Sequence, residues 1–240
     1  MISLQNLDAV ITGASEGLGK SIAEKLASQG CNLALIARNK AKLESLKERL
    51  VSEYQVKVEY YQCDISNSSE VDSTMKKINS DFGKVDILIN NAGVWYEGNL
   101  EEHSTQAINR LFEVNILGMI YTTKELLPSL KSNSYSQILN IASIAGVEPS
   151  SNWGVYTASK HAVRGFTDSL MRELEESSVK VMGFYPGGMN TELFTTSGFH
   201  KFNEPWMMNK DDIAEIIIHM LMQPKDINMR HVEVAKKLKF

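Results

Sequence analysis

Short apolar runs alternate along the chain with longer segments in which apolar residues recur at helical spacing. The apolar runs predict strands, and the longer segments predict helices between them. The predicted strands cover residues 7–12, 33–37, 56–61, 85–90, 137–142 and 179–185. The predicted helices cover residues 20–29, 40–54, 68–82, 104–127, where Pro128 ends the helix, and 155–176.

Strands that alternate with helices in this way form parallel βαβ units. We therefore predict an α/β fold: a single doubly wound Rossmann-type domain over residues 1–240, with a parallel sheet of about seven strands and helices on both faces. The least regular stretch, about residues 190–210, mixes Thr, Ser, Gly, Phe, Asn and Pro. Such a stretch is either a lid over a site or an irregular surface connection.

Composition narrows the class of protein. Lys and Arg number 25 against 29 Asp and Glu, for a net charge of −4, so we expect no nucleic-acid partner. Residues 1–8 do not resemble a signal peptide, and no apolar run reaches about 20 residues. We expect a cytoplasmic protein with no membrane contact.

Cys31 and Cys63 adjoin apolar runs and should be buried without a disulfide. No two histidines have ligand spacing, so we predict no metal site.

A glycine-rich turn follows the first strand, with the sequence Thr12-Gly13-Ala14-Ser15-Glu16-Gly17-Leu18-Gly19. A turn of this kind before a helix brings backbone N–H groups to an anion, typically dinucleotide pyrophosphate. An ordinary tight turn is one alternative. Another is a hydrolase nucleophile, because residues 13–17 match G-x-S-x-G. Ser15 would then need a base such as His219 or His231.

The end of the second strand indicates which dinucleotide is preferred. An acidic residue there would hold the ribose 2′-hydroxyl of NAD. The sequence instead reads Arg38-Asn39-Lys40, and a guanidinium can hold a 2′-phosphate with two hydrogen bonds. This pattern favours NADP(H), unless Arg38 is a solvated residue at the start of a helix.

Tyr156 and Lys160 are the candidate acid–base pair. They stand four residues apart, so they share one face of a helix. An ammonium group beside a phenol lowers its pKa toward a value useful for proton transfer. Ser143 follows a predicted strand and would hydrogen-bond a substrate oxygen. Asn115, an amide in an apolar helical stretch, is either a satisfied core group or the mark of a kink.

Together these residues resemble the classical short-chain dehydrogenase/reductase family from Leu7 to about Met222. The glycine turn matches the family's T-G-x-x-x-G-x-G motif. Asn90-Asn91-Ala92-Gly93 matches N-N-A-G, and Pro186 to Thr191 matches P-G-x-x-x-T. Asp64-Ile65 resembles its D-[VIL] after the third strand. Asn115, Ser143, Tyr156 and Lys160 match the catalytic tetrad in identity and order.

The resemblance implies a hydride transfer between the nicotinamide of NADP(H) and a carbonyl or alcohol. Tyr156 would exchange the proton, Lys160 would lower its pKa and bind the ribose, Ser143 would orient the substrate, and Asn115 would hold a relay water. The implied cofactor-binding residues are Gly13, Ser15, Glu16, Gly17, Leu18, Gly19, Arg38, Asp64, Ile65, Asn91, Ala92, Gly93, Tyr156, Lys160, Pro186, Gly187 and Thr191. Glu16 departs from the basic residue that some NADP(H)-preferring members carry in this turn, so NAD(H) remains possible.

The resemblance also bears on substrate and assembly. Ser143, Trp95, Trp153 and Met189 should contact the substrate, and the apolar lining suggests a moderately hydrophobic ketone or alcohol. By analogy with family members that pair their two long helices, we expect a homotetramer or homodimer. A non-catalytic NADP(H)-binding regulatory protein is the alternative function, although such a protein would be expected to carry a broken tetrad.

Overall fold

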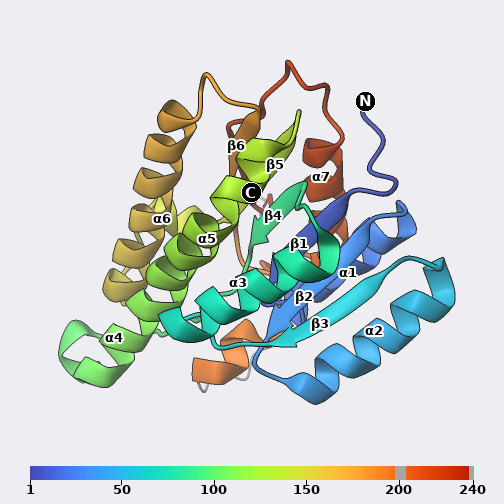
Figure 1. Ribbon diagram of the computed structural model, residues 1–240. Helices are drawn as coiled ribbons and strands as arrows, with labels where there is room; N and C mark the ends of the chain where they lie inside the picture. The colour runs from blue at the N-terminus through green and yellow to red at the C-terminus, as the bar shows by residue number, and fades with distance from the viewer. Residues whose placement is uncertain (198–203, 238–240) are drawn as a thin grey trace.

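Seven parallel strands form one sheet in the computed structural model, which describes residues 1–197 and 204–237 (Figure 1). The strand order is β3-β2-β1-β4-β5-β6-β7. The order reverses direction beside β1, which is the signature of a doubly wound fold. The strands are β1 (Asp8–Thr12), β2 (Asn32–Ala37), β3 (Val58–Gln62), β4 (Ile87–Asn90), β5 (Ser136–Ile141), β6 (Val179–Pro186) and β7 (His231–Val234). The predicted fold class is therefore confirmed.

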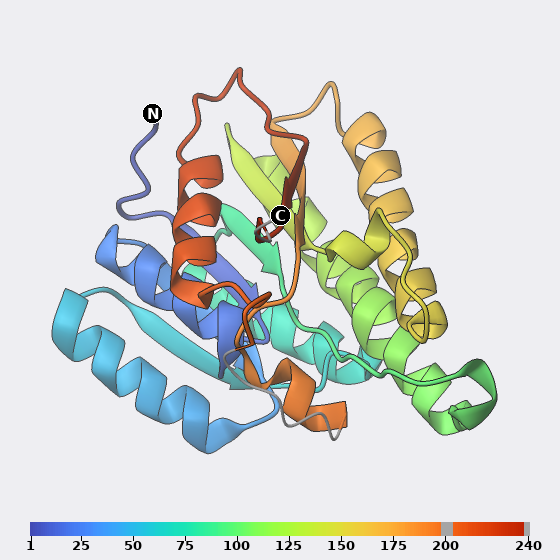
Figure 2. The ribbon, with the colours of Figure 1, turned by 180° about the vertical axis from the view of Figure 1, so that it is seen from behind.

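Helices cover both faces of the sheet. One face carries α1 (Gly17–Ser28), α2 (Lys40–Tyr54) and α7 (Lys210–Leu221), which Figure 2 shows from their own side. The other carries α3 (Ser68–Phe82), α5 (Gly118–Ser132) and α6 (Gly154–Glu173), with α4 (Thr105–Phe112) leading into α5. Short 3-10 segments occur at Leu100–Glu102, Ile144–Gly146 and Glu192–Ser197.

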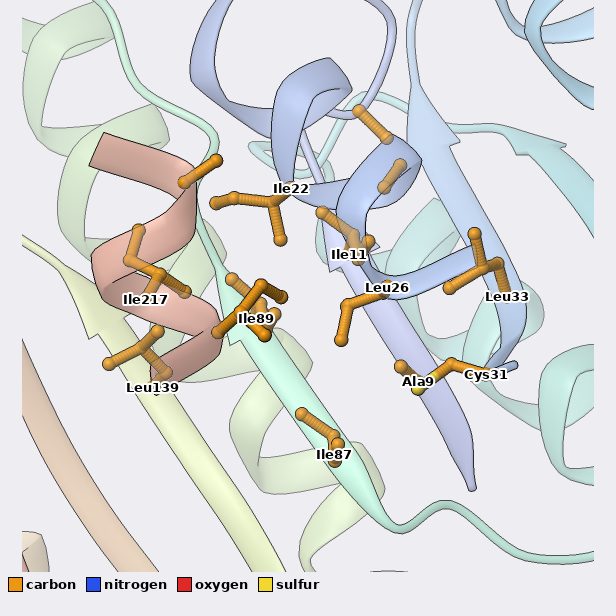
Figure 3. Packing of buried hydrophobic residues seen from close by; sticks show 14 of the residues in the cluster. Ala9, Ile11, Ile22, Leu26, Cys31, Leu33, Ile87, Ile89, Leu139 and Ile217 are labelled. Carbon is orange, nitrogen blue, oxygen red and sulfur yellow. The ribbon is translucent and has the colours of Figure 1, made fainter. Parts of the chain in front are cut away.

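The core follows from the two-residue period of the strands. In β1, Ala9 and Ile11 face α1 and α7, whereas Val10 faces the opposite helices. Figure 3 shows Ile22 and Leu26 of α1 and Ile217 of α7 over the first of these faces, around Ile89 of β4. Both faces are apolar, so the strands read as continuous hydrophobic runs. Cys31 and Cys63 are buried free thiols, as predicted.

The structure corrects several predicted helix boundaries, including the end of the last predicted helix, since α6 ends at Glu173 and not at residue 176. Pro128 does not end its helix, because α5 continues through it to Ser132. Pro128 is exposed, so the carbonyl that loses its hydrogen-bond partner can turn toward water. The first helix begins at Gly17, inside the glycine turn, and not at residue 20. The single helix predicted over 104–127 is divided by a π-helical turn at Glu113–Leu117.

The sequence pattern predicts neither of two elements near the C-terminus, α7 and β7. β7 has only four residues, too few for its alternation to stand out. It pairs with β6 from Gly183↔His231 to Pro186↔Val234. α7 packs on α1. Apolar residues occupy much of the circumference of α7, which weakens the one-sided hydrophobic pattern typical of a surface helix. In both cases tertiary contacts, more than local pattern, define the element.

Candidate active site

A cleft of about 610 Å³ opens at the carboxyl ends of the strands. In doubly wound sheets this edge is where ligands bind. Most predicted site residues line it: Gly13, Ser15, Glu16, Leu18, Arg38, Asp64, Ile65, Asn91, Ala92, Gly93, Trp95, Ser143, Trp153, Tyr156, Lys160, Pro186, Gly187, Met189 and Thr191. Gly17, Gly19 and Asn115 lie behind its wall. Residues from Gly13 to Thr191 thus meet at one edge of the sheet.

The glycine turn requires its glycines for two reasons. Gly13 has a φ of 67°, in the left-handed region. A Cβ on Gly19 would lie 2.3 Å from the carbonyl oxygen of Gly13, so any side chain there would force the turn apart. No side chain caps the start of α1. Its first N–H groups therefore remain available to a phosphate beside the turn.

Thr12, the last residue of β1, joins the glycine turn to the loop after β4. Its hydroxyl accepts hydrogen bonds from the backbone N–H groups of Asn91 (3.0 Å) and Ala92 (3.1 Å). The Asn91 amide donates back to the carbonyl oxygens of Thr12 and Gly13. Thr12 was not among the predicted site residues. A buried threonine at a strand end, facing a neighbouring loop, is the signal that would have identified it.

A cation that was not predicted accompanies Glu16. The Lys42 ammonium, one turn into α2, forms a short ion pair with the Glu16 carboxylate. This hydrogen bond raises the pKa of Lys42, so the ammonium stays charged. Arg38 lines the same end of the cleft. The negative charge that would oppose a phosphate there is thus neutralised by a residue 26 positions away.

Asp64, predicted to contact adenine, is held by two neighbours. Arg110 of α4 donates to its carboxylate at 2.9 Å, and Ser66 donates at 2.8 Å. Burial raises the pKa of Asp64, but these hydrogen bonds outweigh it and hold the value below the ordinary one. Arg110 also lines the cleft. The pair closes the wall between β3 and α4. After Thr12 and Lys42, Arg110 is the third residue of the site that the sequence did not indicate.

Ser143, Tyr156 and Lys160 meet in the middle of the cleft. Ser143 follows β5 and shares a hydrogen bond with the Tyr156 hydroxyl. The Lys160 ammonium lies 5.7 Å from the centre of the Tyr156 ring and donates to the Ile141 carbonyl at 3.3 Å. All three side chains are at least nine-tenths buried. The helical spacing of Tyr156 and Lys160 therefore places both on the face of α6 that covers β5.

The expected effect of Lys160 on Tyr156 is not seen in the protein alone. Burial raises the pKa of the Tyr156 hydroxyl to about 12, although the hydrogen bond to Ser143 opposes this. Burial also lowers the pKa of Lys160 to about 8. The prediction that the ammonium lowers the pKa of Tyr156 is wrong here, because both groups are desolvated and the charge on Lys160 is itself disfavoured.

Asn115 supports the site from behind. Its amide accepts from the Val94 N–H at 2.8 Å and donates to the Val94 carbonyl at 2.9 Å and to Ser159 at 3.1 Å. Its hydrogen bonds make it a satisfied core amide, and it also lies in the π-helical turn, an irregularity in the helix. Both interpretations of the sequence are therefore confirmed. Asn115 and Lys160 both lie within 4 Å of the Cβ position of Gly93. The side chain anchors the β4 loop against α6.

The segment after β6 closes the cleft and packs against the glycine turn. The Gly187 N–H donates to Val234 of β7 at 2.7 Å, which extends the edge of the sheet under the site. Buried Thr191 lies 3.4 Å from the Cβ position of Gly17. Met189 pairs with Met208 in an isolated bridge. Part of the predicted lid, residues 198–203, lies outside the described residues.

The hydrolase alternative lacks its base. His219 contacts the Gln223 side chain at 3.0 Å on the far end of α7. His231 is bonded to Tyr185 and Asp168, both at 2.8 Å. Neither imidazole is therefore available to Ser15.

Within residues 1–197 and 204–237, no group of three or more His, Cys, Asp or Glu could hold a metal, and no helix is long and apolar enough to cross a membrane.

A doubly wound sheet with a glycine turn at its first crossover defines a Rossmann-type protein. The Ser143–Tyr156–Lys160 group points to a dehydrogenase or reductase within that class. The family model described as short chain dehydrogenase matches residues 8–200. The chain belongs to the short-chain dehydrogenase family. An uncharacterized oxidoreductase of Staphylococcus saprophyticus is 37% identical over 98% of this chain and 99% of its own.

Solved structures agree with this assignment. An alcohol dehydrogenase from the archaeon Thermococcus sibiricus, complexed with 5-hydroxy-NADP, is 32% identical with a TM-score of 0.90, covering 98% of this chain and 100% of its own. A short-chain dehydrogenase/reductase from Burkholderia phymatum, in complex with NAD, is 26% identical with a TM-score of 0.87, covering 97% and 90%. The family thus includes chains similar to this one with either dinucleotide.

Proposed function

We propose that this protein reduces a carbonyl compound, or oxidises the corresponding alcohol, with NADP(H) as the hydride donor or acceptor. The observation that carries the proposal is the buried Tyr156 hydroxyl, bonded to Ser143 and backed by Lys160, across the cleft from the glycine turn. The glycine turn, with no side chain capping α1 and no room for a Cβ on Gly19, fits a pyrophosphate.

Each residue has a role that its position supports. A bound reduced nicotinamide supplies the hydride to the carbonyl carbon. The Tyr156 hydroxyl donates its proton to the carbonyl oxygen, which becomes the alcohol oxygen. Ser143 donates a hydrogen bond to the same oxygen while charge develops on it. Lys160, which lies behind Tyr156, would hold the ribose of the dinucleotide, and Thr191 would hold its nicotinamide.

The preference for NADP(H) rests on charge at the end of β2. Arg38 would hold the 2′-phosphate, and Lys42 cancels the opposing charge of Glu16. Without the ion pair Glu16 would repel a phosphate near the same turn. The three side chains together leave one positive charge there, which favours a 2′-phosphate over a 2′-hydroxyl.

The test is reduction of a carbonyl panel followed through the absorbance of NADPH and of NADH, with the wild type and Tyr156→Phe. The variant should lose at least roughly 100-fold in kcat, because proton transfer in the transition state is lost. NADPH binding, read by fluorescence, should be kept. Full activity in Tyr156→Phe would overturn the mechanism. Binding without any wild-type turnover would favour a regulatory NADP(H)-binding protein.

Assembly and domain organisation are part of the same proposal. We infer one domain with a lid near residues 190–210 and an oligomer built on α5 and α6. Light scattering would then give two or four times the 26.9 kDa of one chain.

A further inference from the structure

The end of the cleft beyond Tyr156 is built from aromatic rings that meet edge to face. Trp95 lies 5.9 Å from Trp153 at 88° and 4.9 Å from Phe194 at 81°. Trp153 meets the Tyr156 ring at 6.4 Å, again at 88°. The rings come from the loop after β4, the start of α6 and the segment after β6. They form an unbroken aromatic wall beside the hydroxyl proposed to donate the proton.

Charge is distributed unevenly along the cleft. Among the described residues, the charged lining side chains are Glu16, Arg38, Asp64, Arg110 and Lys160. The first four belong to the dinucleotide end, and Lys160 lies behind Tyr156. Val94, Ile144, Met189 and Leu193 add aliphatic side chains to the lining of the same cleft. A substrate that enters beyond Tyr156 thus meets rings and aliphatic carbon.

We propose that the substrate is a neutral aryl ketone or aryl aldehyde, or the matching aryl carbinol in the reverse direction. The proposal rests on the proposed function and names its substrate class. A planar ring has both a face and an edge to offer, so it can join a set of perpendicular rings that a saturated ring fits less well. A carboxylate or a polyhydroxylated chain would lose its hydration there without a partner.

Trp153 sets where the ring must be attached. Its ring contacts that of Tyr156, whose hydroxyl marks the position of the reacting oxygen. A ring bonded directly to the carbonyl carbon reaches Trp153, while a ring several carbons away extends past it. Trp153 is only partly buried, whereas Trp95 is 2% exposed. Replacing Trp153 therefore tests the contact with less risk to folding.

The experiment compares kcat/KM for three ketones with NADPH: acetophenone, cyclohexyl methyl ketone and benzoylformate. Acetophenone and cyclohexyl methyl ketone differ in the planarity of the ring. Benzoylformate keeps the planar ring and carries a carboxylate in place of the methyl group of acetophenone. We expect acetophenone to exceed its saturated partner roughly tenfold, the effect of one or two edge-to-face contacts. It should exceed benzoylformate at least roughly 100-fold. Calorimetry with the NADP⁺ complex, in which no ketone is reduced, should give the same order of affinities.

Trp153→Leu should lower kcat/KM for acetophenone more than for cyclohexyl methyl ketone, so that their ratio falls toward one. The matched control is Phe82→Leu, which removes a ring at the end of α3, outside the cleft, and should leave the ratio unchanged. Turnover of benzoylformate or small aliphatic ketones in preference to acetophenone would overturn the substrate class and leave the reductase standing. Absence of turnover with every ketone would overturn both.

Discussion

At the scale of single residues, the net charge at the proposed dinucleotide end of the cleft depends on one lysine, Lys42. Glu16 alone argues against a phosphate, and Arg38 alone argues for one. The ion pair with Lys42 supports the proposed NADP(H) preference, because it offsets the negative charge of Glu16 without using Arg38. Both partners are partly exposed, with 49% and 38% of their side-chain surface accessible, so the effect is modest.

Lys42→Ala should therefore weaken NADPH binding roughly two- to fivefold and NADH binding much less, since only NADPH carries a 2′-phosphate near Glu16. Fluorescence titration at low salt measures both constants. Lys47→Ala is the matched control, because Lys47 of α2 pairs with Glu59 at 2.7 Å, outside the cleft. An equal loss for both cofactors would show that Lys42 supports only the fold.

At the scale of elements, local pattern predicted most of the architecture. The bounds of α2 and α3 agree with the prediction, because each carries one apolar stripe and an asparagine cap. The pattern failed where water can compensate a local cost, as at exposed Pro128 in α5. It also failed for β7, which exists because β6 offers it an edge.

The junction of β1 and α1 yields a stability prediction. Gly19→Ala should lower the free energy of unfolding by about 1–3 kcal/mol, because its methyl group would meet backbone oxygen at 2.3 Å. Gly165→Ala is the control, because Gly165 is an exposed position of α6 with nothing within 4 Å of its Cβ position, and it should raise that free energy by up to about 1 kcal/mol. Urea unfolding measures both. Equal stability of Gly19→Ala and wild type would contradict the tight approach.

At the scale of the whole molecule, burial of Lys160 links folding to pH. Its pKa falls from 10.5 to about 8, so between these values the native protein binds fewer protons than the unfolded chain. The free energy of unfolding must then gain a contribution that rises with pH across this window. Below pH 8 the native protein bears the cost of a buried ammonium.

Lys160→Met removes that contribution. The free energy of unfolding of the variant, minus that of the wild type, should fall by about 3 kcal/mol between pH 7 and pH 10.5. Only the wild type loses a buried positive charge over this range and is stabilised by the loss. Urea unfolding without cofactor at the two pH values gives the difference. A pH-independent difference for Lys160→Met would mean that the ammonium is not desolvated.

The sequence by itself determined the α/β class, six of the seven strands, the glycine turn, and the identity and order of Ser143, Tyr156 and Lys160. These depend on local periodicity and on short motifs, which a linear chain displays directly. Only the tertiary structure decided the partner of Glu16, the locking role of Thr12, the pKa directions at Tyr156 and Lys160, and the meeting of Trp95, Trp153 and Phe194. Each of these depends on distance or burial between residues far apart in the chain, and the sheet brings them together because the carboxyl ends of all its parallel strands share one edge.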